Sequence, residues 1–243
     1  MKKHFEKGGK LERLHPLYDM IETIFIVRPT KTIKGSHIRD NIDLKRMMAL
    51  VLLAGMPALF VGIYNAGFQH YASLGMEVSL LDCIIKGLFI FIPILVVTYV
   101  SGGIWEVLFA VIRKHEVNEG FFVTGFLIPL ILPPTIPLWQ VAVGTSFGVV
   151  VGKEVFGGTG MNIFNPALVT RAFIFFAYPA AISGNEVWTL FGNKVVDTYT
   201  KATPLSVAVD SGGREVLSLL HTSGYSFWKM FLGIIPGSIG ETS

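Results

Sequence analysis

The sequence predicts an all-α integral membrane protein, a multi-span helical bundle with broken helices. Three observations support this fold class. Hydrophobic residues make up 51% of the chain and charged residues only 15%, and the mean hydropathy is +0.58, a balance typical of membrane proteins. Residues 47–64 carry no charge and are long enough to cross a bilayer. Several other apolar runs are interrupted by proline or glycine, as happens where helices are broken at membrane depth.

Residues 1–46 form a basic arm that precedes the first apolar run. Eleven of the 20 Lys and Arg residues lie in it, interleaved with six acidic residues. This mixture indicates a solvated arm at the membrane surface rather than a nucleic-acid-binding stripe. The apolar periodicity of residues 14–25 fits either an amphipathic helix on the membrane or an ordinary packed surface helix. By the positive-inside rule the arm stays in the cytoplasm, and no cleavable signal peptide is visible before Met47.

Five apolar segments are expected within residues 47–183. The first span, 47–64, is followed by a mixed loop over 65–86 and a second span over 87–112. A short segment at 121–132 contains Pro129 and runs into further prolines, so it crosses only if protein or water covers its backbone. The fourth and fifth segments cover 139–151 and 167–182.

Counting these crossings from the cytoplasmic arm places the loop over 184–226 outside the membrane, which in a bacterium is the periplasm. The count depends on the proline-broken segment crossing completely, and the side assignment flips if that segment is re-entrant. Residues 227–243 begin another apolar stretch, and the chain stops as that span starts. We therefore expect an N-terminal fragment of a longer, repeat-built subunit.

Several kinds of site are excluded by the motifs themselves. A single cysteine, Cys83, allows no disulfide framework and no cysteine-based metal site made by this chain alone. The glycines of residues 157–160 lack the Lys and Ser or Thr of a phosphate loop, and the start of a zinc-protease motif at His115 fails because Glu119 stands where a second histidine is needed.

Several polar or small positions in or beside the apolar segments are candidate functional residues. Glu106 lies in the second span, where an unpaired charge costs roughly 2.5 to 3.5 kcal/mol, unless it reaches water at the helix end. Gly102 and Gly103, just before it, allow a flat ligand or another helix to approach the backbone. Asn162 and Asn165 precede a helix start, with Arg171 beyond them, and amides of this kind suit the polar edge of a planar heterocycle.

The polar stretch 197–205 stands between apolar blocks in the outer loop. It contains Thr203 between Ala202 and Pro204, which present the hydroxyl on a constrained backbone. Nothing nearby forms a Ser-His-Asp arrangement, so hydrolase chemistry is not expected. From the residues alone this stretch is a polar loop.

Taken together, the motifs resemble the NqrB/RnfD family, which unites one membrane subunit of sodium-translocating NADH:quinone oxidoreductases with its counterpart in Rnf complexes. The resemblance covers nearly the whole chain. The basic arm and the run at 113–122 favour the sodium-pump subunit over the Rnf subunit. The similar runs are His37-Ile-Arg-Asp, residues 43–47, Gly102-Gly-Ile-Trp-Glu, residues 113–124, residues 147–160, Asn165-Pro-Ala-Leu and Pro236-Gly-Ser-Ile-Gly-Glu.

This resemblance implies a covalent flavin. In that family a flavin transferase joins FMN through its phosphate to the threonine that ends a motif of the form Asp-x-x-Ser/Thr-x-Ala-Thr. Here the motif falls on Asp197, Thr200, Ala202 and Thr203. Two positions where glycine is common hold Thr198 and Lys201 here, and Lys201 would either pair with the flavin phosphate or slow attachment.

The other implied roles are also carried over position by position. Asn162 and Asn165 match positions associated with a non-covalent riboflavin, and Arg171 is counted with them as a candidate cofactor-binding residue. Gly102 and Gly103 match a pair linked to quinone binding, and Glu106 matches an acid of the sodium path. The family implies a six-subunit complex of the bacterial inner membrane that passes electrons from FMN through riboflavin to ubiquinone or menaquinone while exporting sodium. NADH is expected to bind another subunit, since no dinucleotide motif occurs here.

Two other functions are compatible with the residues. An Rnf-type subunit would serve ferredoxin-linked electron transport rather than quinone reduction. A cofactor-free channel or small-solute transporter would also have broken spans, glycine-rich helices and polar groups at mid-depth.

Overall fold

Two long antiparallel helices form one side of the molecule. The computed structural model describes residues 44–114, 120–190, 202–213 and 215–242, and these contain helices but no strand, as predicted. Helix α3 covers Leu44–Ser73 and helix α4 covers Leu80–Arg113. Both are long and apolar enough to cross a membrane. Many of their outward side chains are exposed and apolar, including Phe60, Phe89 and Ile104, as expected for surfaces that face lipid or another protein.

Glycines let these two helices approach backbone to backbone. A Cβ added at Gly67 in α3 would overlap the carbonyl oxygen of Cys83, and a Cβ at Gly87 in α4 would overlap the carbonyl oxygen of Ile63. Small residues at a helix contact are typical of membrane bundles, where close packing replaces the hydrophobic driving force. The glycine pair therefore sets the separation of α3 and α4.

Helices α3 and α4 are both longer than the sequence predicted. The expected loop at 65–86 belongs to α3 as far as Ser73 and to α4 from Leu80 onward. The polar residues that suggested a loop face the interior instead. Asn65 donates to the carbonyl of Ile235 at 2.8 Å, Gln69 donates to Asn65 at 3.2 Å, and His70 Nδ1 lies 2.6 Å from the carbonyl oxygen of Leu190. These contacts satisfy polar groups that would otherwise be costly to bury, so the helix continues to Ser73.

Shorter helices pack on the inner side of α4. Helix α5 covers Gly120–Ile131, α6 covers Leu138–Gly152, and α7 covers Pro166–Ala177. Helix α4 packs against α3, α5 and α6, and α6 packs against α7. The contacts enclose an apolar core with nearly inaccessible side chains from four segments: Ile94, Ile128, Leu132, Ile174 and Ile239.

Helices α5 and α6 form a hairpin joined by the proline segment. They contain 12 and 15 residues, about 18 and 22 Å at about 1.5 Å per residue, which is less than the roughly 30 Å of a hydrocarbon core. Arg113, the last residue of α4, and Lys153, which directly follows α6, both bond within one cluster of charges. The open ends of the hairpin therefore lie at the same end of the bundle, and the crossing count gives the same side for the later loop whether the hairpin crosses fully or not.

The fifth predicted segment, 167–182, is broken in the structure. Helix α7 ends at Ala177, and the four-residue helix α8, Pro179–Ile182, follows. Pro179 explains the break, because proline disfavours helical geometry at the residue before it, and Tyr178 has φ −135° and ψ 59°.

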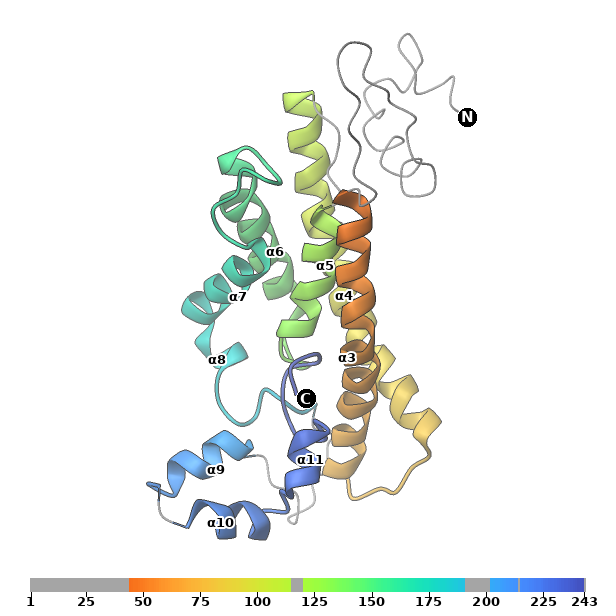
Figure 1. Cartoon of the computed structure of the whole chain (residues 1–243), viewed down its shortest axis with the longest axis vertical. Coiled ribbons are helices and arrows are strands. Elements are labelled where there is room, and N and C mark those ends of the chain that lie inside the picture. The colour runs from red at the N-terminus through yellow and green to blue at the C-terminus, as the bar shows by residue number, and fades with distance from the viewer. Residues whose placement is uncertain (1–43, 115–119, 191–201, 214, 243) are drawn as a thin grey trace, which may run out of the picture.

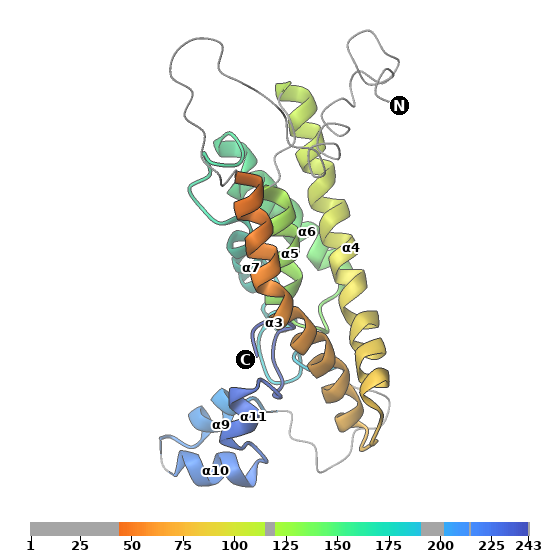
Figure 2. The ribbon, with the colours of Figure 1, turned by 45° about the vertical axis from the view of Figure 1, so that its right-hand side comes forward.

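Three short helices lie beyond the bundle: α9 at Pro204–Asp210, α10 at Val216–Thr222 and α11 at Phe227–Phe231. They gather at one end of the molecule, and the C-terminal end of α4 lies at the other (Figures 1 and 2). The 3₁₀ helix η2, Glu154–Phe156, lies at the same end as the C-terminus of α4. In the described part of 227–243, where the sequence predicts the beginning of a further span, α11 is followed by an irregular segment. That segment turns back into the bundle, where Gly240 N–H bonds to Leu130 at 2.8 Å.

Candidate functional site

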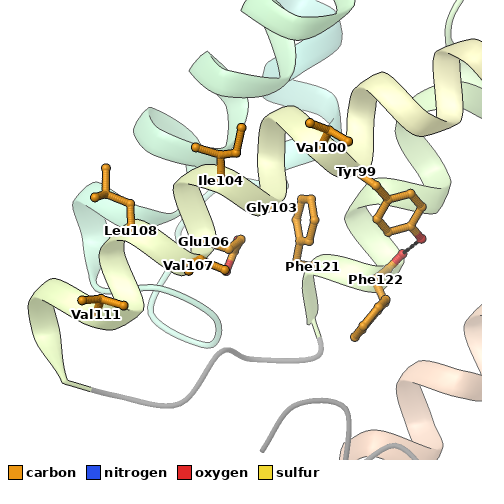
Figure 3. A pocket seen from close by; sticks show the side chains of 10 residues that line it. All are labelled: Tyr99, Val100, Gly103, Ile104, Glu106, Val107, Leu108, Val111, Phe121 and Phe122. Carbon is orange, nitrogen blue, oxygen red and sulfur yellow. Dashed lines mark hydrogen bonds between the residues drawn. The ribbon is translucent and has the colours of Figure 1, made fainter. Parts of the chain in front are cut away.

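An apolar groove runs along the C-terminal half of α4, where the start of α5 lies against it. Its volume is about 700 Å³. Figure 3 shows Phe121 and the Glu106 carboxylate on the same side of α4. The Tyr99 hydroxyl donates to the backbone carbonyl of Phe122 at 2.8 Å. This bond joins α4 to the start of α5 at the end of the groove that lies nearer the centre of the bundle. The lining residues are Tyr99, Val100, Gly103, Ile104, Glu106, Val107, Leu108, Val111, Phe121 and Phe122.

The two adjacent glycines of α4 have different surroundings. A Cβ at Gly102 would overlap the ring of Phe121 and would lie 3.2 Å from the methyl carbon of Thr145. A Cβ at Gly103 would meet only Phe121, at 3.9 Å, which is ordinary contact. Gly102 therefore holds Phe121 against the helix, whereas Gly103 leaves room in the groove for a ligand.

Glu106 is a charged residue that lines this groove, and its carboxylate forms an ion pair. Its side chain is 5% exposed, and Oε1 accepts a hydrogen bond from Lys153 Nζ at 2.5 Å. The side chain of Lys153, which directly follows α6, is 4% exposed. Removing one member of such a buried pair leaves an uncompensated charge and is strongly destabilising. The carboxylate is thus held inside the bundle by a partner from another helix, not by reaching water.

A second buried acid continues the cluster. Glu154, in η2, has a side chain that is 2% exposed, and its Oε1 lies 3.8 Å from Lys153 Nζ. Arg113 donates to Glu154 Oε2 at 3.2 Å and to the Glu154 backbone carbonyl at 2.6 Å. When ionised, these four side chains alternate in sign along the chain of contacts, from Arg113 through Glu154 and Lys153 to Glu106.

Sequence reasoning identified Glu106 but missed Lys153 and Glu154. One signal could have found Lys153. It ends the fourth apolar segment, and the crossing count puts that point at the same end of the bundle as Arg113. A buried acid and a cation at the same depth are natural partners. No group of three or more His, Cys, Asp or Glu suited to a metal ion occurs among the residues that the structure describes.

The two amides and Arg171 bond to different parts of the chain. Asn162 accepts from Gly160 N–H at 3.1 Å and donates to the Phe164 carbonyl at 2.8 Å. Asn165 caps α7, accepting from the backbone N–H of Ala167 at 2.9 Å. These bonds stabilise the loop and the helix start.

Arg171, which was expected with these amides, bonds instead to Glu241 at 2.6 Å. The ion pair ties α7 to the irregular C-terminal segment, where Ser238 also donates to Glu241 at 3.2 Å. The three side chains predicted to share a riboflavin site therefore have separate bonding partners in this structure.

Thr203 is the N-cap of α9 at the opposite end of the molecule. Its Oγ1 accepts from Ser206 N–H at 3.2 Å, and Pro204 takes the first helical position, where proline is favoured. The side chain is partly exposed. The buried Tyr225 donates its hydroxyl to the Ala202 carbonyl at 2.6 Å. Esterification would leave Oγ1 in place, so the residue fits a phosphoester attachment. Asp197, Thr200 and Lys201 lie outside the described residues.

Comparison with known proteins agrees with the resemblance seen in the motifs. Residues 31–243 match the profile of the NQR2, RnfD, RnfE family. The chain belongs to this family. A relative with a similar sequence is the B subunit of the Na(+)-translocating NADH-quinone reductase of Azotobacter vinelandii, which is 51% identical over 264 aligned residues. The alignment covers 99% of this chain and 63% of that protein.

Other proteins of this name are similarly close. The one from Stutzerimonas stutzeri is 52% identical, with 99% of this chain and 63% of the relative covered. The one from Yersinia pestis is 47% identical, with 99% and 64% covered. The chain thus spans less than two thirds of the length of these relatives. The family resemblance expected from the motifs is confirmed.

Proposed function

We propose that this chain is a membrane redox subunit of a sodium-pumping NADH:quinone oxidoreductase, in which electrons pass from covalent FMN towards ubiquinone or menaquinone while sodium is exported. The observation that carries the proposal is the groove beside Gly103, which is lined by the buried Glu106. It combines an apolar site for a flat ring with an ionisable group at membrane depth. The relatives' names point to the same reaction.

The chain's own residues have separable tasks in this proposal. Gly103 leaves space for the quinone ring, and Phe121 forms the aromatic wall beside it. Glu106 interacts with the sodium ion. At the other end, Tyr225 and the cap geometry of Thr203 hold the attachment point. When bound there, FMN supplies one-electron redox chemistry, and the protein positions it.

The proposal extends to location and partners. We place the chain in the bacterial inner membrane with residues 1–46 in the cytoplasm and Thr203 in the periplasm, where a flavin transferase would act. The domains are then the arm, a membrane region over 47–183, a periplasmic region over 184–226 and the segment 227–243. Its partners would be membrane lipid and the other subunits of a six-subunit complex, one of which binds NADH. Riboflavin is retained on the resemblance alone, and no step is assigned to it.

Quinone binding tests the groove directly. Gly103→Leu places a branched side chain where the quinone ring is proposed to lie. We expect the KM for quinone of the purified complex to rise about tenfold or more, a loss of roughly 1.4 kcal/mol, with less effect on the turnover rate.

Val96→Leu serves as the matched control, because Val96 is an exposed residue of α4 that does not line the groove. An unchanged KM in Gly103→Leu would remove the quinone from this groove. Quinone reduction by the complex also separates this proposal from the Rnf-type alternative, and lack of any redox activity would favour a transporter.

Sodium dependence tests Glu106. Glu106→Gln removes the negative charge while keeping the shape of the side chain. We expect the sodium concentration that gives half-maximal stimulation of quinone reduction to rise roughly tenfold, since about 1.4 kcal/mol of cation binding is lost. Glu77→Gln, in the exposed turn between α3 and α4, is the control. If sodium stimulation in Glu106→Gln matched the wild type, Glu106 would have a structural role only.

A further inference from the structure

Glu106 already has a cation bound to it, and that cation belongs to the protein. The Lys153 ammonium lies 2.5 Å from Glu106 Oε1, and both side chains are at most 5% exposed. A sodium ion and an ammonium group are both monovalent cations that bind a carboxylate oxygen. They compete for this oxygen, so Lys153 must move before sodium can take its position.

A second carboxylate stands within reach of Lys153. Glu154 Oε1 lies 3.8 Å from the same ammonium nitrogen. Arg113 holds the other oxygen of this carboxylate and its backbone carbonyl, so the acceptor stays in place. The flexible lysine stem can turn its point charge from one carboxylate to the other.

The Lys153 ammonium can pair with a carboxylate in either of two positions, on Glu106 or on Glu154. On Glu106 it occupies the carboxylate oxygen Oε1 of the acid that lines the groove, and on Glu154 it has withdrawn from that oxygen, where a cation can then bind. An uncompensated ammonium in this buried environment would be costly, whereas transfer between two carboxylates avoids that cost. Glu106 is the member of the cluster that opens to the groove, so a cation arriving there meets it first.

We propose that Lys153 is a tethered competitor for sodium at Glu106 and that Glu154 is its alternative partner when sodium binds. This inference rests on the proposed sodium role of Glu106. It assigns to Lys153 and Glu154 the control of cation affinity: Lys153 opposes sodium binding, and Glu154 favours it by accepting the displaced ammonium.

The two residues should therefore change sodium affinity in opposite directions. In the purified complex at pH 8, where few protons compete for a carboxylate, we expect Lys153→Met to lower the half-saturating sodium concentration for quinone reduction by roughly fivefold or more. Glu154→Gln should raise it by a similar factor, because the ammonium loses its second acceptor. A purely structural role would not produce shifts of opposite sign.

Lys153→Arg is the matched control, because it keeps a cation beside Glu106. Its half-saturating sodium concentration should equal or exceed that of the wild type, and this comparison remains informative if Lys153→Met fails to assemble. A fall in Lys153→Arg, a rise or no change in Lys153→Met, or shifts of the same sign in the Lys153→Met and Glu154→Gln variants would each overturn the inference. An unchanged half-saturating sodium concentration in Glu106→Gln would instead overturn the sodium role of Glu106 in the proposed function.

Discussion

Replacing Thr203 by alanine should abolish covalent flavin attachment to this chain. The phosphoester needs the Oγ1 oxygen, and alanine has none, so we expect complete rather than partial loss. The measurement is flavin fluorescence of the chain on a denaturing gel, after production together with the flavin transferase. Denaturation removes any flavin that is not covalently bound, so the remaining signal reports attachment alone.

Thr203→Ser is the control for this experiment. Serine keeps both the hydroxyl and the ability to cap α9 by accepting from Ser206 N–H, so its band should persist. Any weakening of α9 that alanine causes is separated from loss of the attachment oxygen by comparison with Val207→Gly, which lowers helix propensity within α9 and keeps Thr203. Fluorescence in Thr203→Ala equal to that of the wild type would place the flavin on another residue.

Replacing Gly87 by valine should prevent stable packing of α3 on α4. The first carbon of the new side chain would overlap the carbonyl oxygen of Ile63. A backbone oxygen cannot turn away as a flexible side chain can. Overpacking of this kind costs about 3 kcal/mol or more. We expect a markedly lower melting temperature in detergent and little assembled complex.

Gly103→Ala provides the comparison for packing, since its Cβ meets only the Phe121 ring at 3.9 Å. It should melt within a few degrees of the wild type. If Gly87→Val melted as the wild type does, the backbone contact between α3 and α4 would not be the packing determinant described above.

Hydrophobic runs predicted the helices of the bundle but not all their limits. The α5 and α6 segments were predicted within a few residues, because proline and charge mark their ends. The end of α3 was not, because Asn65 and Gln69 carry the composition of a loop. Their bonds, to each other and to Ile235, far along the chain, keep that part of α3 inside the bundle, and local patterns carry no information about such a contact.

The functional candidates divide in the same way. Glu106 could be found from the sequence because a charge within an apolar span is costly. Its pairing with Lys153 joins residues 47 positions apart and depends on how α6 packs against α4. The helix start at Thr203 was missed although threonine followed by proline is a standard start signal. Its anchor, Tyr225 on the Ala202 carbonyl, depends on the tertiary arrangement.

The mass of the tryptic peptide that covers residues 202–214 tests the central claim most directly. Trypsin cleaves after Lys201 and Arg214, so this peptide isolates Thr203. In chain produced with its flavin transferase, we predict the unmodified mass plus that of FMN less one water, with fragmentation assigning the addition to Thr203. An unmodified peptide from a chain that nonetheless carries covalent flavin would contradict the assignment, and an unmodified peptide from an active complex with no covalent flavin would contradict the proposed flavin role of this chain itself.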